Sequence, residues 1–391
     1  MNSGKYVFSQ FVEFLPRYEF DKLVMKFNGN FHTRSLSCYN QFLHLLFGQL
    51  TACESLRDIC LCLKAHQRVL YHLGFRHTVD ESSLSRANER RDYRIYEGLG
   101  YILIDLVRPM YADEKIPEIY CQDYDVFALD STTISCSVKL LSWALGKYTK
   151  GAVKMHTVID LRGSIPVFIN ITDGRCHDSN FLDIIEPVHN AIYTMDKAYV
   201  DFKALYLINQ CDSFFITRAK DTMRYEIVET NYNIDYSIGL RGDHIIKLSG
   251  NKSSGLYPAP IRLVEYYDSE NDEYLRFITN NTELNALEIA DLYRRRWDIE
   301  CFYKWLKQNL TIKKFWGYSE NAVKLHLWVA ICTFLIIARI KARYKSPYTI
   351  TEVATILSVS ALEKIDLDEL LTNPELLNQN QNVKNEFSRI T

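Results

Sequence analysis

A basic, aromatic and acidic set of side chains lies in residues 293–307. At roughly 100° per residue on a helix, Tyr293, Arg296, Glu300 and Lys307 fall on one side, beside an apolar stripe. A carboxylate is then held at the edge of a core with cations next to it. This suits Glu300 to hold a divalent cation, and Arg296 and Lys307 to bind nucleic-acid phosphates. An ordinary amphipathic surface helix with a salt-bridged face explains the same pattern.

Two short apolar runs further up the chain each lead into an aspartate. Residues 125–129 precede Asp130, and residues 191–195 precede Asp196. Both runs predict strands, so each carboxylate is expected at or near a strand end, where a sheet opens to solvent. Together with Glu300 they make three carboxylates, enough to bind two Mg²⁺ ions about 4 Å apart. We therefore predict that Asp130, Asp196 and Glu300 are catalytic and hold the metal ions.

The elements that must position these acids alternate between strands and helices. Helices are predicted after Asp178 and Asp201, and a hairpin turn at Arg162-Gly163. The predicted strands are residues 126–129, 152–160, 165–171, 191–195 and 213–217. Three strands joined by short turns, then strand, helix and strand, is the order of the ribonuclease H-like fold. A β-rich insertion at about residues 221–282 interrupts it, with strands predicted at 225–229, 244–248, 261–267 and 274–279.

The spacing Tyr-x2-Arg-x3-Glu-x6-Lys at residues 293–307 resembles the signature of the bacterial insertion-sequence transposases of the Asp-Asp-Glu class, specifically the insertion sequence four family. Two companion motifs match as well. One is Leu129-Asp130-Ser-Thr, and the other, Asp196-Lys-Ala-Tyr199, is similar to the family's Asp-x-Gly/Ala-Tyr/Phe. The resemblance runs from about residue 120 to residue 340.

This resemblance implies a DNA transposase that cuts an insertion sequence at its terminal inverted repeats and joins the 3′-hydroxyl ends to target DNA. The cofactor would be two Mg²⁺ ions, with Mn²⁺ able to substitute, and Tyr293, Arg296 and Lys307 would bind DNA. Family members commonly pass through a DNA hairpin, and the C-terminal region helps subunits pair, so a homodimer is expected in the DNA complex. Some relatives receive an unstacked base on a tryptophan of the β-rich insertion, but this insertion contains none.

The chain of 391 residues, 47% of them hydrophobic, predicts a multi-domain enzyme. We expect a helical N-terminal DNA-binding domain at residues 1–115, a ribonuclease H-like catalytic domain at 120–345, and a helical C-terminal tail at 346–391 that ends Asn/Gln-rich and mobile. The fold class is α/β. No secretory signal is expected, and the apolar stretch 325–338 is short for a membrane span and fits a core helix.

The net charge of −2 lacks the basic footprint of many nucleic-acid binders, so DNA contacts must come from local patches. One patch is the predicted helix at residues 82–94, capped by Ser82 or Ser83. If it is the second helix of a helix-turn-helix, Arg86, Asn88 and Arg90 reach bases or phosphates. A solvated connecting helix is the alternative.

The ten cysteines form no disulfide or zinc pattern, which fits a reducing compartment. We expect a bacterial cytoplasmic protein associated with the nucleoid, with no membrane partner.

Two other pairs of residues invite a functional role: His177 and Asp178 near the metals, and Lys154 and His156 on a predicted strand. Asp178 follows His177 and fits a helix cap. Lys154 and His156 alternate on one strand face, either facing DNA or lining the solvent side.

Two other functions use the same residues. One is a ribonuclease H-like nuclease without strand transfer, and the other is a non-catalytic DNA-binding descendant. Three retained metal carboxylates count against the second.

Overall fold

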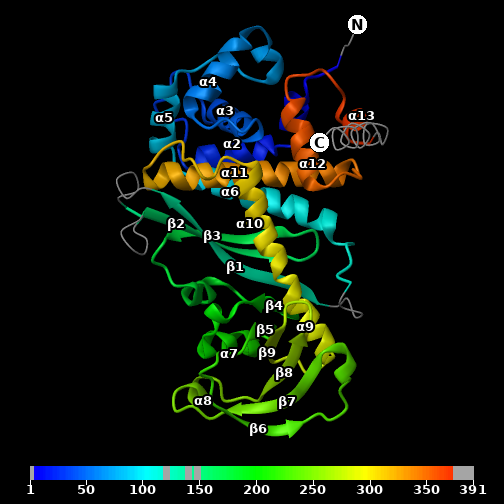
Figure 1. Ribbon diagram of the computed structural model, residues 1–391. Coiled ribbons are helices and arrows are strands. Elements are labelled where there is room, and N and C mark those ends of the chain that lie inside the picture. Colours follow the sequence, from blue (N-terminus) through cyan, green and yellow to red (C-terminus); the bar gives the residue numbers. More distant parts are fainter. Residues whose placement is uncertain (1–3, 118–123, 137–142, 145–150, 373–391) are drawn as a thin grey trace, which may run out of the picture. The chain divides into compact units, whose positions relative to one another are not determined.

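The computed structural model describes residues 4–117, 124–136, 143–144 and 151–372. The chain divides into two compact units, Met1–Tyr111 with Lys304–Thr391, and Ala112–Tyr303 (Figure 1). The division falls inside the helix that carries Glu300. The predicted assignment of DNA-binding, catalytic and tail domains stays a prediction. The expected Asn/Gln-rich end of the tail lies outside the described residues.

The first unit is helical over its described residues, as predicted for the N-terminal region. The central helix α11 (Glu320–Arg343) packs against α3 (Cys38–Leu50) and α6 (Arg94–Val107). Capping boxes at Ser55/Asp58 and Thr349/Glu352 satisfy free backbone groups where two further helices begin. The other elements are α1 (Val7–Glu13), α2 (Arg17–Lys26), α4 (Leu56–Ala65), η1 (Gln67–Leu73), α5 (Glu81–Arg90), η2 (Arg108–Tyr111), α12 (Ile350–Val359) and α13 (Leu367–Thr372).

Helix α11 is longer than the predicted apolar stretch. It has 24 residues and a mean hydropathy of 1.9 over its most apolar window, so length and composition alone would allow it to cross a membrane. However, 89% of that window is buried inside the protein. Burial on all sides is typical of a core helix, which agrees with the prediction for residues 325–338.

The described part of the second unit forms a 9-stranded sheet in the order β3-β2-β1-β4-β5-β9-β8-β7-β6 (Figure 1). Strand β1 pairs with β4 in parallel, and β4 with β5 in parallel, whereas β1 to β2 and β2 to β3 are antiparallel. The strands are β1 (Asp125–Cys136), β2 (Gly151–Asp160), β3 (Ile165–Asp173), β4 (Ala191–Met195), β5 (Phe214–Arg218), β6 (Tyr225–Thr230), β7 (Leu240–Leu248), β8 (Ile261–Asp268) and β9 (Glu273–Thr279).

The four strands predicted as an insertion do not form a separate sheet. Strand β9 pairs antiparallel with β5, so β6 to β9 extend the sheet that carries the predicted catalytic aspartates. The positions of the strands are as predicted within a few residues. Their continuity with the first five strands depends on the pairing of β5 with β9, which no local pattern of residues specifies.

Helices and turns in the second unit follow from local capping chemistry. Asp201 caps α7 (Phe202–Gln210), and Asn285 with Glu288 forms a capping box at the start of α9 (Ala286–Arg295). The predicted helix after Asp178 is the 3₁₀ helix η4 (Asp178–Ile184). The hairpin between β2 and β3 has positive φ at Gly163 and Ser164. The remaining elements are η5 (Lys197–Tyr199), η6 (Tyr236–Ile238) and α8 (Ser253–Leu256).

Two local predictions need correction. The segment around Arg296 is not one helix, because α9 ends at Arg295 and α10 (Trp297–Asn309) begins two residues later. Arg296 at the junction keeps right-handed helical angles, so the four-residue spacing from Arg296 to Glu300 is preserved. In addition, Asp130 does not end its strand: β1 continues to Cys136.

Candidate active site

Asp130 and Asp196 lie where two parallel strands stop pairing. The last paired residues of β1 and β4 are Leu129 and Met195, so each aspartate is the next residue along the chain, Asp130 within β1 and Asp196 just after β4. Beyond this point the described part of β1 pairs with β2, while the segment after β4 turns into η5. Because Leu129 and Met195 lie opposite each other, the two aspartates that follow them lie side by side where the strands diverge. The Asp130 carboxylate is therefore accessible because the pairing of β1 with β4 ends beside it, although β1 itself continues.

The Asp130 carboxylate is partly buried and held by its neighbour. The Ser131 backbone N–H donates to Asp130 Oδ1 at 2.8 Å. Burial raises the pKa of Asp130 to about 6, and the charges of Glu300 and Asp196 also raise it, whereas Ser131 and Arg296 lower it. Glu300 on α10 and Asp196 after β4 thus both lie near enough to act electrostatically on the Asp130 carboxylate.

Arg296 joins two of these acids. Its Nη2 lies 2.6 Å from Glu300 Oε1, and its Nη1 lies 3.4 Å from Asp130 Oδ2. The side chains are 16% exposed for Arg296, 21% for Asp130 and 33% for Glu300, so the cluster is reachable from solvent. A cation is therefore placed between an acid on β1 and an acid on α10.

Tyr293 supports the arginine from α9. The Arg296 guanidinium carbon lies 5.8 Å from the centroid of the Tyr293 ring, and that ring packs on Phe277 at 4.8 Å. Burial raises the pKa of Tyr293 to about 12, so the phenol is a neutral hydrogen-bond donor near pH 7.

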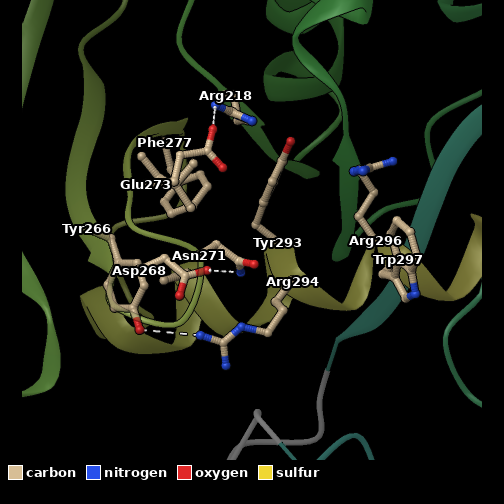
Figure 2. A pocket seen from close by; sticks show the side chains of 12 residues that line it. Arg218, Tyr266, Asp268, Asn271, Glu273, Phe277, Tyr293, Arg294, Arg296 and Trp297 are labelled. Carbon is tan, nitrogen blue, oxygen red and sulfur yellow. Dashed lines mark hydrogen bonds and ion pairs between the residues drawn. The ribbon is translucent and has the colours of Figure 1, made fainter.

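A cavity of about 400 Å³ lies beside Tyr293 and Arg296 (Figure 2). Its wall carries an ion pair between Arg218 and Glu273, and Arg294 Nη2 donates to the Tyr266 hydroxyl at 3.3 Å. Trp297 is 59% exposed at its edge. The cavity therefore combines cations and aromatic rings next to the acid cluster.

Tyr303 anchors the helix that carries Glu300, a contact that the sequence reasoning missed. Its hydroxyl donates to the backbone carbonyl oxygen of Asp130 at 2.8 Å, and the carbonyl oxygen of Met155 lies 3.3 Å away. The side chain is buried. A polar atom at position i+3 from Glu300 is the signal that could have suggested it, because these positions share a helix face.

The acids suit a divalent cation in chemistry but are not gathered into a finished metal site. Carboxylate oxygens are the ligands that Mg²⁺ takes in proteins. Within the described residues, no three Cys, His, Asp or Glu side chains lie close enough together to hold a metal ion. Two of the three predicted ligands instead share Arg296. The donor set therefore fits a divalent cation once the guanidinium releases at least one carboxylate.

Lys307 follows Glu300 on α10 but belongs to the helical unit. Burial lowers its pKa, and nearby Lys313 lowers it further. Its predicted contact with DNA stays a prediction.

Of the residues predicted to contact DNA on α5, two are exposed and one is buried. Arg86 and Arg90 face solvent. Asn88 is 1% exposed, its Oδ1 accepts from Gln41 Nε2 at 2.7 Å, and its carbonyl accepts from Asn321. Asn88 therefore holds helices together and does not fit the predicted role in reading DNA. The helix begins at Glu81, earlier than predicted.

Comparison with known proteins defines the class. The family model described as "Transposase DDE domain" matches residues 122–336, more than half of the chain, and a domain of unknown function, DUF4372, matches residues 3–76. The chain belongs to this family of DDE transposases, within the class found in bacterial insertion sequences.

Several relatives have names that agree. A transposase of Sinorhizobium fredii, y4zB, is 32% identical over 55% of this chain and 60% of its own length. A transposase for the element IS4SA of Synechocystis is 26% identical over 74% of this chain and 80% of its own. A transposase for IS5377 of Geobacillus stearothermophilus is 27% identical over 54% and 55%. The match thus spans less than two thirds of two of these relatives.

Among solved structures, a piggyBac transposase synaptic complex with hairpin DNA has a TM-score of 0.43 and 10% identity, over 95% of this chain and 82% of that one. This similarity is too weak to define the fold.

Proposed function

We propose that this protein is a DNA transposase that cuts an insertion sequence at its terminal inverted repeats and joins the 3′-hydroxyl ends to target DNA. The observation that carries the proposal is the cluster of Asp130, Arg296 and Glu300 beside Asp196, in a chain of this family. The strand order β3-β2-β1-β4-β5, with β1, β4 and β5 parallel, supports a ribonuclease H-like core. Strands β6 to β9 are then the insertion that extends its sheet.

Membership of the family implies the use of divalent metal ions. We assign the ligands as Asp130, Asp196 and Glu300 and the cofactor as two Mg²⁺ ions, with Mn²⁺ able to substitute. When bound, the ions make a water or a 3′-hydroxyl more nucleophilic and stabilise the leaving oxygen of the phosphodiester.

The chain's own residues hold the DNA for an in-line reaction. Arg296 moves from the acids to a phosphate of the DNA end, because phosphate and carboxylate compete for one guanidinium. The neutral phenol of Tyr293 donates a hydrogen bond to the same phosphate, and Lys307 adds a second positive charge. These contacts oppose the repulsion between a negatively charged nucleophile and the phosphate.

The reaction then follows in two steps on this site. Water attacks the phosphodiester at each element end, and the bond to the 3′-oxygen breaks, which releases a 3′-hydroxyl. That hydroxyl attacks a phosphodiester of the target, or first the opposite strand in a hairpin route. In each step one phosphorus–oxygen bond forms as another breaks: the first step leaves a 5′-phosphate and a 3′-hydroxyl, and the second forms a new phosphodiester as the target's 3′-oxygen leaves.

The helical N-terminal region, with Arg86 and Arg90 exposed on α5, is assigned to binding of the terminal repeats. We expect the protein to act in the bacterial cytoplasm at the nucleoid, as a homodimer in the DNA complex.

The test is to incubate the purified protein and Mg²⁺ with duplexes that carry the repeats flanking its coding region. Hairpins and strand-transfer products support the transposase. Nicking without joining favours the nuclease, and binding without any cleavage favours the non-catalytic descendant. Asp130→Asn is the control, because it removes a ligand charge but keeps the shape of the side chain.

A further inference from the structure

Behind Asp130, the described residues form a polar network around a fourth acid, Asp178. This residue was expected to cap the helix that follows it, but no side-chain cap bond forms at the start of η4. Instead, Asp178 Oδ1 accepts a hydrogen bond from Ser131 Oγ at 2.6 Å and pairs with Lys154 Nζ at 2.9 Å. Its carboxylate is thus turned back onto β1 and β2.

Ser131 connects this network to the candidate active site. Its side chain donates to Asp178, and its backbone N–H donates to Asp130 Oδ1. In the β1–β2 register Ser131 lies opposite His156, and Thr133 lies opposite Lys154, so all four share one face of the sheet. Since neighbouring side chains on a strand point to opposite faces, Asp178 acts on β1 from the face opposite the Asp130 side chain.

The network is partly buried and holds neighbouring segments together. Lys154 Nζ also donates to the Cys176 carbonyl at 3.0 Å, which fixes the loop before η4. His156 is fully buried, stacks on Phe181 at 5.0 Å, and has Nδ1 3.7 Å from Asp178. Burial lowers the pKa of His156 to about 4, and Lys154 lowers it further, so this ring is neutral near pH 7. Burial opposes ionisation of Asp178, but Ser131 and Lys154 keep its pKa below the usual value.

We propose that Asp178 is a positioning residue that, through Ser131, orients the Asp130 carboxylate for metal binding. The inference rests on the proposed function and names a residue that the reaction needs but that does not touch the metal or DNA. Both partners that hold the Asp178 oxygen are protein groups, Ser131 and Lys154, so its negative charge is already neutralised. Loss of Asp178 frees the Ser131 hydroxyl and removes a side-chain contact that holds Ser131, whose backbone N–H donates to Asp130, in its place on β1.

The effect expected is that of losing a group that orients a metal ligand, about a 10–100-fold loss of metal affinity. The measurement is Mn²⁺ binding to the full chain, followed by the loss of the free Mn²⁺ signal in electron paramagnetic resonance, with and without repeat DNA. Asp178→Ala and Ser131→Ala should weaken Mn²⁺ binding at least tenfold. Ser131→Thr, which keeps the hydroxyl, should stay within about twofold of the unmodified chain.

Ser135→Ala is the matched control, because Ser135 is exposed on the same strand four residues further along. It should leave Mn²⁺ binding unchanged. Asp178→Asn keeps an oxygen acceptor for Ser131. If circular dichroism shows that Asp178→Ala is unfolded, the Mn²⁺ affinity of Asp178→Asn takes its place in the test. Its expected loss is smaller than that of Ser131→Ala.

Unchanged Mn²⁺ affinity in folded Asp178→Ala and Ser131→Ala would overturn the positioning role. A loss in Ser131→Thr equal to that in Ser131→Ala would also overturn it, because the hydroxyl would then not be the group that matters. Asp130→Asn separates the two ideas. If that variant binds Mn²⁺ as the unmodified chain does, the proposed metal site itself is wrong.

Discussion

Two arginine–carboxylate clusters in the sheet unit use the same chemistry for different ends. Arg262 on β8 meets Asp243 on β7 with Nε at 2.8 Å and Nη2 at 3.0 Å, the paired geometry in which Arg binds a carboxylate best. Arg296 contacts two acids: Glu300, four residues further along the chain, at 2.6 Å, and Asp130 on β1 at 3.4 Å. We call the buried Arg262–Asp243 pair the closed cluster, and the partly exposed set of Arg296, Asp130 and Glu300 the open cluster.

The closed cluster leaves little for any other ligand. Nη1 of Arg262 donates to the carbonyl oxygens of Leu284 and Asn281, and Asn231 donates to Asp243. The side chains are 8% and 6% exposed. Every strong donor is matched inside the protein, so this pair holds β7 and β8 to the loop before α9.

The open cluster has charge available for exchange. Its arginine divides one guanidinium between Asp130 and Glu300, and Glu300 is one-third exposed. A phosphate can take the arginine, and a divalent cation can take the acids. Burial and the number of protein partners, and not the residue types, therefore separate a structural ion pair from a candidate catalytic one.

The largest expected effect comes from the open cluster. Glu300→Gln or Asp130→Asn should lower cleavage of repeat DNA by roughly 10³-fold or more, because each removes a ligand charge needed for metal-assisted transfer. DNA binding should stay largely intact. Cleavage is measured on a labelled duplex, and binding by fluorescence anisotropy.

Asp243→Asn is the matched control for this loss, since it removes the same charge from the closed cluster. At a temperature where it is folded, it should retain cleavage. Persisting cleavage in both Asp130→Asn and Glu300→Gln would remove the catalytic assignment.

The next effect is on stability and comes from the closed cluster. Arg262→Met should lower the free energy of unfolding by about 3–5 kcal/mol, because it leaves Asp243 buried without its partner. Arg241→Met on the exposed face of β7 should cost less than about 1 kcal/mol. Urea unfolding followed by circular dichroism measures both. Equal losses in the two variants would show that the buried pair has no special role.

Much of the open cluster could be predicted from the sequence. The apolar runs before Asp130 and Asp196 predicted the strands, and the four-residue spacing placed Arg296 and Glu300 on one helix face, because these signals are local. The succession of strands and helices along the chain and the helical N-terminal region were also predicted in outline. What local signals lack is pairing between distant segments.

The parts that could not be predicted all depend on such pairing. The end of the β1–β4 contact, and not the end of β1, exposes Asp130. Asn88 lies on a helix with arginines at i−2 and i+2, and only the packing of Gln41 against it shows that it is buried. The Arg262–Asp243 pair crosses two strands whose register no motif specifies.

A smaller effect is expected on the salt dependence of DNA binding, which should distinguish Arg296 from Arg241. Arg296→Ala should weaken DNA binding and reduce the slope of log affinity against log salt by about one, as expected for one lost phosphate contact. Arg241→Ala, which changes an arginine on the insertion, should leave the slope unchanged. Anisotropy titrations between low and moderate salt measure it. An unaltered slope in Arg296→Ala would place this guanidinium away from the DNA.

The smallest effect is a difference in pH dependence between the clusters. Burial opposes ionisation of Asp243, but the hydrogen bonds from Arg262 and Asn231 lower its pKa below the ordinary value of 3.8. Its contribution to stability is therefore present above pH 3.8 and lost as the pH falls through the lowered value. Asp130 has the opposite sign: its pKa is raised from 3.8 to about 6, so its contribution is present below 3.8 and lost as the pH rises through about 6.

Urea unfolding in EDTA, from acid to neutral pH, tests these signs. Asp243→Asn should flatten the loss of stability at the acid end. Asp130→Asn should instead flatten the loss between pH 3.8 and about 6, because an amide cannot ionise. If both variants changed the same limb of the curve, the open cluster would be as saturated as the closed one, and the free exchange of Arg296 between acid and phosphate would lose its physical basis.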